Sequence, residues 1–206
     1  MSATLSTTLV PMLPHVPVSL PTRSYGWLGA VGRTWLRISG WRVEGQFPEE
    51  PRMVVALAPH SSNWDFVHVV AVVFALRLRV CFIGKHTLFR APLGGFMRWL
   101  GGIPVDRSRT DGLVHATTEA MRSTPAMWIG ITPEGTRTRG SSFRSGFYRI
   151  AQAAAVPILP ISINHQRRII ALHAPLPATG PVEEGVETVR SLLLAHGCRH
   201  DMRRQP

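Results

Sequence analysis

Short apolar runs alternate with helical patterns along most of the chain, and this alternation constrains the fold more than any other feature. The clearest strand-like runs are MVVALAP (53–59), RLRVCFIG (77–84) and AMWIGIT (126–132), and a segment of helical character follows each. Strands that alternate with helices build α/β sheets with a large parallel part. The sequence therefore predicts one α/β domain, with a central and mostly parallel sheet flanked by helices.

The second half of the chain is expected to complete this domain. VPILPISIN (156–164) has the composition of a strand, but Pro157 and Pro160 predict an edge or interrupted strand because proline cannot donate to a sheet. VEEGVETVRSLLLAHG (182–197) predicts a terminal helix. The 206 residues suffice for one core and contain no internal repeat.

The N-terminal region divides into two parts. Residues 1–22 are rich in Ser, Thr and Pro and are expected to form a poorly ordered arm before a domain at 23–206. Residues 25–38 predict an amphipathic helix, in which glycines are unfavourable. Its apolar stripe comprises Trp27, Leu28, Val31, Trp35 and Ile38, and Arg33 and Arg37 lie opposite. Such a helix suits a membrane interface, but a helix packed on the domain's own core has the same pattern.

The chain is strongly basic, with 23 Lys and Arg against 12 Asp and Glu, a net charge of +11. An excess of this size favours anionic partners: nucleic acid, anionic lipid or a phosphorylated substrate. The arginines are dispersed and no nucleic-acid-binding motif is present, so nucleic acid is not an expected partner, and a basic nucleic-acid-binding module is kept only as the rival interpretation of the charge. The two cysteines, Cys81 and Cys198, form no disulfide framework and fit a reducing compartment.

One polar pair stands directly after the first apolar strand, in LAPHSSNWDF (57–66). If His60 ends the strand and Asp65 lies in the first turn of the next helix, the carboxylate can fold back onto the imidazole. Such a pair is a general base that can activate a hydroxyl. The alternative is structural: Ser62 to Asp65 matches a capping box, which explains the aspartate without chemistry.

Two further stretches place polar residues after strands. GGIPVDR (101–107) delivers Arg107, and ITPEGTRTRG (131–140) sets Glu134, Gly135, Thr136 and Arg137 on a turn. Glycine allows close approach to a ligand, and a guanidinium suits a phosphate. Loops at the carboxyl ends of parallel strands are where α/β sheets bind ligands. The plainer reading is a set of exposed salt bridges, such as Glu134 with Arg137.

Taken in order, these stretches and VPILPI (156–161) resemble the four sequence blocks of the glycerolipid acyltransferase family, which includes the lysophosphatidate (1-acylglycerol-3-phosphate) acyltransferases. The resemblance covers about residues 50–165. It implies that His60 is the base and Asp65 orients it, and that Arg107 and Arg137 clamp the acceptor's phosphate. The other residues that it assigns to the phosphate pocket are Glu134, Gly135, Thr136 and Lys85. The family's K-x-E-L stretch has Thr87 in place of its glutamate here, so the assignment of Lys85 is the weakest.

The resemblance implies an O-acyltransferase that moves a fatty acyl group from acyl-CoA or acyl carrier protein to a lysophospholipid hydroxyl, foremost 1-acylglycerol 3-phosphate. Glycerol 3-phosphate, another lysolipid or a hydroxylated lipid remain alternative acceptors. No tightly bound cofactor and no metal are expected. The longest apolar run, at 66–76, has 11 residues, about half of a membrane span. The expected location is therefore peripheral, on an anionic membrane surface at the cytoplasmic face of the cell membrane.

Overall fold

The computed structural model describes residues 13–60, 62–105, 110–134 and 143–197. Six α-helices, one short 3-10 helix and seven strands are defined in these ranges. In chain order they are α1 (Leu28–Ser39), β1 (Arg42–Glu44), β2 (Arg52–Ala58), α2 (Asn63–Ala75), β3 (Val80–Lys85), η1 (His86–Phe89), α3 (Gly94–Trp99), β4 (Gly102–Val105), α4 (Thr110–Ser123), β5 (Met127–Ile131), α5 (Gly146–Ala154), β6 (Ile158–Asn164), β7 (Ile169–Leu172) and α6 (Val182–His196).

The strands form one sheet in the order β1-β7-β6-β2-β5-β3-β4. Strands β6, β2, β5, β3 and β4 run parallel to one another, and the β6–β7 pair is antiparallel. Strand β1 pairs in parallel with β7 and therefore also runs against the rest. The predicted single α/β domain with a mostly parallel sheet is confirmed.

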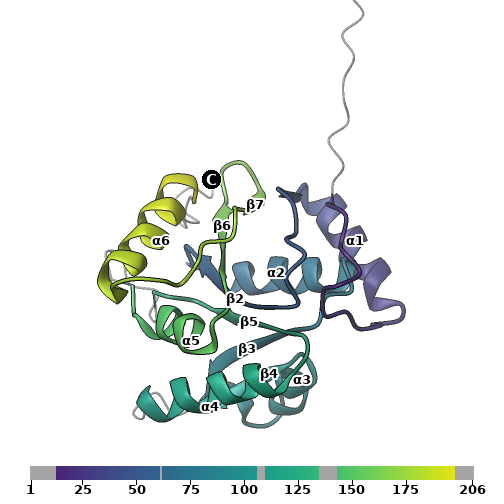
Figure 1. The fold of residues 1–206 in the computed structure, drawn as a ribbon. Coiled ribbons are helices and arrows are strands. Elements are labelled where there is room, and N and C mark those ends of the chain that lie inside the picture. Colours follow the sequence, from purple (N-terminus) through teal and green to yellow (C-terminus); the bar gives the residue numbers. More distant parts are fainter. Residues whose placement is uncertain (1–12, 61, 106–109, 135–142, 198–206) are drawn as a thin grey trace, which may run out of the picture.

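Helices cover both faces of the sheet, as Figure 1 shows. Helices α1 and α2 bury one apolar cluster, which includes Leu36, Val72 and Trp128. Helices α4, α5 and α6 bury the other, which includes Met121 and Phe147. Figure 1 places α1 at the right of the sheet and α5 beside α6 at the left. The sheet is thus sealed on both sides, and its strand ends are left to carry polar groups.

Helix α1 packs on α2 through its glycines. A Cβ atom at Gly32 would lie 2.5 Å from the Ala71 carbonyl oxygen, closer than real Cβ contacts come. Gly29, Gly32 and Leu36 are the buried residues of the helix. The glycines that weaken the isolated helix therefore allow the two helix backbones to approach closely, and this packing offsets their low helix propensity.

Strand β6 corrects one expectation, since it is an internal strand between β7 and β2. Pro160 lies inside it, opposite Ala56 of β2. The Pro160 carbonyl accepts a hydrogen bond from the backbone N–H of His173, beyond the end of β7. Because the N–H and C=O of a strand residue point to the same side, the missing N–H of Pro160 removes no bond to β2. The proline therefore costs the ladder little.

Part of the expected N-terminal arm is packed on the domain. Leu20 is 3% exposed, and Leu13 and Val16 lie against the cluster under α1 and α2. Residues 1–12 of the expected arm lie outside the described ranges. Over the ranges that are described, the longest apolar helix falls short of the length needed to cross a bilayer.

Candidate active site

The parallel strands that carry or precede the four sequence blocks end at one edge of the sheet. His60 lies two residues beyond β2, Glu134 three residues beyond β5, and His165 directly after β6. These strands are parallel neighbours, so their carboxyl ends meet at the same edge. Strands β3 and β4 end at this edge too, with Lys85 as the last residue of β3. The polar residues of distant segments are thus brought together by strand direction alone.

His60 and Asp65 face each other across the strand–helix turn. Nδ1 of His60 lies 3.5 Å from Oδ2 of Asp65. The His60 side chain is 21% exposed, whereas that of Asp65 is fully buried. A buried carboxylate on Nδ1 stabilises the imidazolium that forms when Nε2 takes a proton. Contacts of this kind are often long in resting sites and shorten when substrate binds. The predicted pairing has the geometry of a general base with its orienting acid.

The structural alternative, a capping box, is also present, and the Asp65 side chain belongs to it. Ser62 caps α2: its hydroxyl accepts from the backbone N–H of Trp64 at 3.2 Å. Oδ2 of Asp65 accepts from the backbone N–H of Ser62 at 2.8 Å. The carboxylate is therefore anchored to the helix start, and this anchoring sets its position relative to the imidazole.

Glu134 is buried at 3% exposure, which excludes the exposed-turn reading for this residue. Its Oε2 accepts from the backbone N–H of His60 at 3.3 Å. The family's third block is thereby attached to its first, and the attachment uses the main chain of His60. Glu134 holds the loop that carries the imidazole.

A second histidine, which the sequence did not single out, completes the site. Nε2 of His165 is hydrogen-bonded to Oδ1 of Asp65, and its side chain is 8% exposed. Because an ionised carboxylate only accepts, the imidazole is the donor. His165 is 100 positions from Asp65 in the chain. The one available signal was its place directly after an apolar strand, the same signal that marked His60.

Trp41 and His68 pack against this second histidine. Trp41 meets the His165 ring edge to face, with centroids 5.2 Å apart, and stacks on His68 at 4.2 Å. Trp35 of α1 donates its indole N–H to Nδ1 of His68 at 3.2 Å. A chain of contacts from Trp35 through His68 and Trp41 to His165 therefore connects α1 to Asp65.

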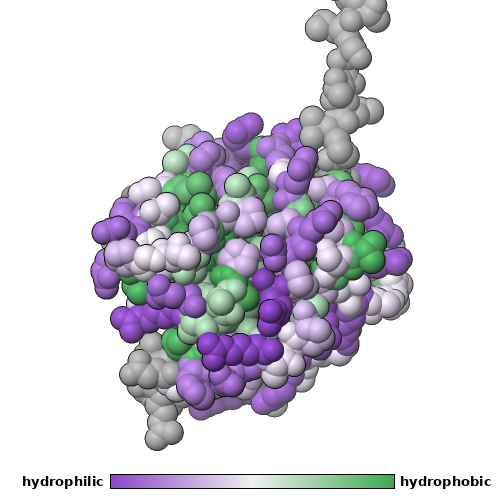
Figure 2. Space-filling model, viewed as in Figure 1, coloured by the Kyte–Doolittle hydropathy of each residue, from purple (hydrophilic) through white to green (hydrophobic). Residues whose placement is uncertain are grey.

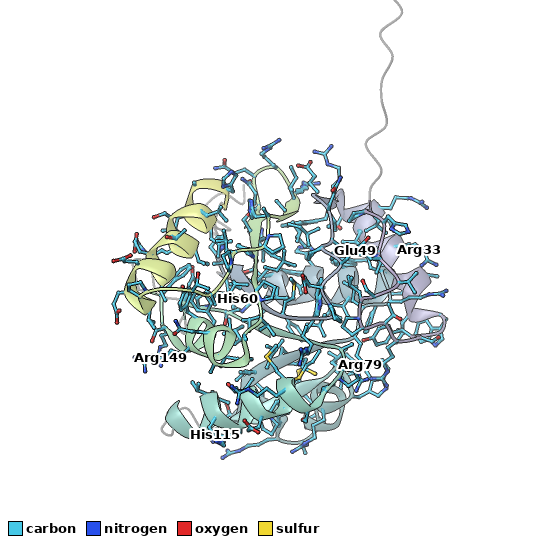
Figure 3. The ribbon with its side chains drawn as sticks, viewed as in Figure 1. Arg33, Glu49, His60, Arg79, His115 and Arg149 are labelled. Atoms are coloured by element: carbon cyan, nitrogen blue, oxygen red, sulfur yellow. The ribbon has the colours of Figure 1, made fainter. Side chains whose placement is uncertain are left out.

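The other assigned residues are only partly described. Arg107, Gly135, Thr136 and Arg137 lie outside the described residues, and so does Cys198. Lys85 ends β3 at the site's edge of the sheet. In the described ranges, no cluster of three or more His, Cys, Asp or Glu side chains has an arrangement suited to a metal ion. Figure 3 labels His60 near the middle of the view, with Arg33, His115 and Arg149 toward the periphery.

Comparison with known proteins identifies the family. The model of the family described as Acyltransferase matches residues 41–164, more than half of the chain. Among curated proteins, the chain is 27% identical over 158 residues to a 1-acyl-sn-glycerol-3-phosphate acyltransferase of Haemophilus influenzae, covering 71% of this chain and 65% of that protein. It is 29% identical over 181 residues to the protein of that name from Escherichia coli, covering 79% and 72%.

A solved structure shares the fold. It is that of the 1-acyl-sn-glycerophosphate (LPA) acyltransferase PlsC from Thermotoga maritima, with a TM-score of 0.61, 20% identity, and coverage of 81% of this chain and 75% of that one. The chain belongs to the acyltransferase family. It spans just under two thirds of the length of the Haemophilus relative.

Proposed function

We propose that the protein transfers a fatty acyl group from a thioester donor, acyl-CoA or acyl carrier protein, to the hydroxyl of 1-acylglycerol 3-phosphate, giving phosphatidate. One observation carries the proposal: the His60 imidazole, backed by the buried Asp65 carboxylate, stands at the carboxyl edge of the sheet in a chain of the acyltransferase family. The named relatives are 1-acyl-sn-glycerol-3-phosphate acyltransferases, which supports this acceptor.

The reaction needs one proton carrier and no acyl-enzyme. Nε2 of His60 takes the proton of the acceptor hydroxyl while its oxygen attacks the thioester carbonyl, and Asp65 stabilises the resulting imidazolium. The tetrahedral intermediate collapses as the C–S bond breaks. The imidazolium returns its proton to the departing thiolate, so that the products are the ester and the free thiol.

Acceptor choice is the property to test first. Charge-assisted hydrogen bonds to a phosphate contribute about 1.5–3 kcal/mol each. The full chain, given labelled acyl-CoA or acyl carrier protein, is therefore expected to use lysophosphatidate with a kcat/KM at least about 10-fold above that for 1-acylglycerol, which lacks the phosphate. Equal use of both acceptors would exclude a phosphate clamp. Absence of transfer to every acceptor, including glycerol 3-phosphate, would exclude the function.

An acceptor that carries a fatty acyl chain stays in the bilayer, so the enzyme has to bind the membrane surface to reach it. Helix α1 presents apolar side chains to solvent on the side away from its packed glycines: Trp27 is 74% exposed, Val31 46% and Ile38 80%. Figure 2 shows hydrophobic side chains at the surface over α1. We infer that this ridge of Trp27, Val31 and Ile38 rests on an anionic membrane, with Arg37 on its flank adding about 1 kcal/mol.

Replacing Trp27 and Ile38 together by serine is expected to weaken sedimentation with vesicles of phosphatidylglycerol and phosphatidylethanolamine at least about 10-fold, because each large apolar side chain contributes about 1.5–3 kcal/mol when fully buried. Both side chains project away from the core, so the fold remains. Leu194→Ser is the matched control: Leu194 is 43% exposed on α6, which covers the other face of the sheet. Equal vesicle binding by all three proteins would rule out the ridge.

A further inference from the structure

His165 touches the acid of the catalytic pair and has no role in the reaction described above. Its Nε2 meets Oδ1 of Asp65, while the other oxygen, Oδ2, faces His60 at 3.5 Å and accepts from the Ser62 backbone N–H at 2.8 Å. The two oxygens of one carboxylate are thus divided between two imidazoles. The torsion that turns a carboxylate is soft. The Ser62 backbone N–H holds Oδ2, and at Oδ1 the contact with His165 is much shorter than that with the Ser62 hydroxyl at 3.5 Å, so the Ser62 N–H and His165 together fix the plane of the carboxylate.

We propose that His165 is a positioning residue, which donates Nε2–H to Asp65 and holds the carboxylate in the orientation that presents Oδ2 to His60. The proposal rests on the proposed function, and it assigns His165 no contact with substrate. Its effect on the base is indirect. A hydrogen-bond donor on Oδ1 favours the ionised form of Asp65 and keeps its second oxygen aimed at Nδ1 of His60.

His165 is itself held firmly. It opens the turn that joins β6 to β7, in which the Asn164 side chain accepts from the backbone N–H of Arg167 at 3.0 Å. The same turn is attached to the strand before β2, since the backbone N–H of Arg42 donates to the carbonyl of Arg168 at 2.9 Å. Adjacent to that attachment, Trp41 lies edge to face against the His165 ring. The ring therefore has little freedom to leave the carboxylate.

The titratable groups around Asp65 come from four segments. His60 follows β2, Glu134 follows β5, His165 follows β6, and His68 lies one turn further along α2 with its ring 6.5 Å from that of His165. Among them, His60 and His165 have nitrogens directed at Asp65. A hydrogen bond donated to a carboxylate favours its charged form. Without the His165 donor the carboxylate can turn away from His60, which removes stabilisation of the imidazolium, so the pair releases its proton at lower pH.

The test compares His165→Ala, His165→Gln and a matched control in the full chain. The side-chain amide nitrogen of glutamine takes about the place of an imidazole Nε2, so glutamine keeps a donor but cannot be protonated. The control is His173→Ala, which removes another partly buried histidine that bonds a side chain of β6, through Nε2 to Ser162 Oγ at 2.8 Å, without contact with Asp65. Burial, together with His196, lowers the pKa of His173.

In acyl-transfer assays, His165→Ala is expected to lower kcat about 10- to 100-fold, the effect of one hydrogen bond to a charged group, with KM for the acceptor changed less than about 2-fold. The acid limb of its pH profile moves to lower pH, because the imidazolium has lost its oriented carboxylate. His165→Gln restores most of kcat and the original limb, and His173→Ala resembles the wild type. Unchanged kcat in His165→Ala, or equal losses in the alanine and glutamine variants, would overturn the proposal. So would an equal loss in the His173 control.

A second readout needs no substrate. Imidazole nitrogen–proton NMR spectra, with the His60 signal assigned by its loss in His60→Ala, follow the titration of the pair. The titration is expected at lower pH in His165→Ala and at the wild-type position in His165→Gln. An unshifted titration in His165→Ala contradicts the positioning role. If the wild-type protein acylates no acceptor, but the titration still shifts between wild type and His165→Ala, the proposed function is refuted and the role of His165 stands.

Discussion

Alanine in place of His60 is expected to remove acyl transfer while leaving the fold in place. General base catalysis contributes about 10²–10⁴ in rate, so kcat should fall by at least about 10²-fold and transfer should disappear in most assay formats. The bond between this position and Glu134 uses the backbone N–H and survives the substitution. The side chain is mostly buried, at 21% exposure, and its loss takes one partner from the buried Asp65 carboxylate, so it should cost about 1–3 kcal/mol of stability.

Single-turnover transfer of a labelled acyl group, alongside thermal unfolding by circular dichroism, checks this prediction. The unfolding midpoint should fall by no more than about 12 °C, and unfolding should remain cooperative. A His60→Ala protein that is folded and still transfers acyl groups at the wild-type rate would assign the base to another residue. The His173→Ala variant described above serves as the matched histidine control.

Alanine in place of Asp65 is expected to impair both activity and stability, because one buried carboxylate serves the helix cap and two imidazoles. The rate should again fall by about 10²-fold or more. Loss of the cap contributes about 1 kcal/mol, and the buried His165 donor left without an acceptor about 1–3 kcal/mol, so the free energy of unfolding should fall by about 2–4 kcal/mol.

Asp65→Asn separates the two roles. The amide oxygen can still accept from the Ser62 backbone N–H, so most of the stability should return in denaturant titrations. The activity should not return, because a neutral amide does not stabilise an imidazolium. Wild-type activity in Asp65→Asn would reduce Asp65 to a helix cap, and the pairing with His60 would then carry no chemistry.

Local patterns predicted most of the fold and the first half of the site. Alternating apolar runs defined the parallel strands, and the strand–turn–helix spacing brought His60 and Asp65 together as expected. Both are properties of short stretches of sequence. Such stretches also contained the capping box, and the structure shows that the cap and the pairing coexist in Asp65.

The features that the sequence did not predict depend on contacts between segments that are distant in the chain. His165 reaches Asp65 only because β6 lies next to β2, and no local pattern reports which strands are neighbours. Pro160 suggested an edge strand because proline lacks an N–H. A central strand tolerates it when the missing N–H would point to the side where few ladder bonds are made, and the sequence does not show that side. Gly32 suggested a weak helix, because its stabilising effect comes from close packing against Ala71 of another helix, which the local sequence does not show.

The central claim is that the acceptor hydroxyl is deprotonated by His60, and a crystal structure of the full chain with lysophosphatidate bound tests it most directly. The account predicts that the free hydroxyl of the acceptor lies within about 3.2 Å of Nε2 of His60, with Nδ1 of that ring facing Oδ2 of Asp65. An acceptor hydroxyl that is bonded to a different side chain, with the His60 ring turned away from it, would contradict the account.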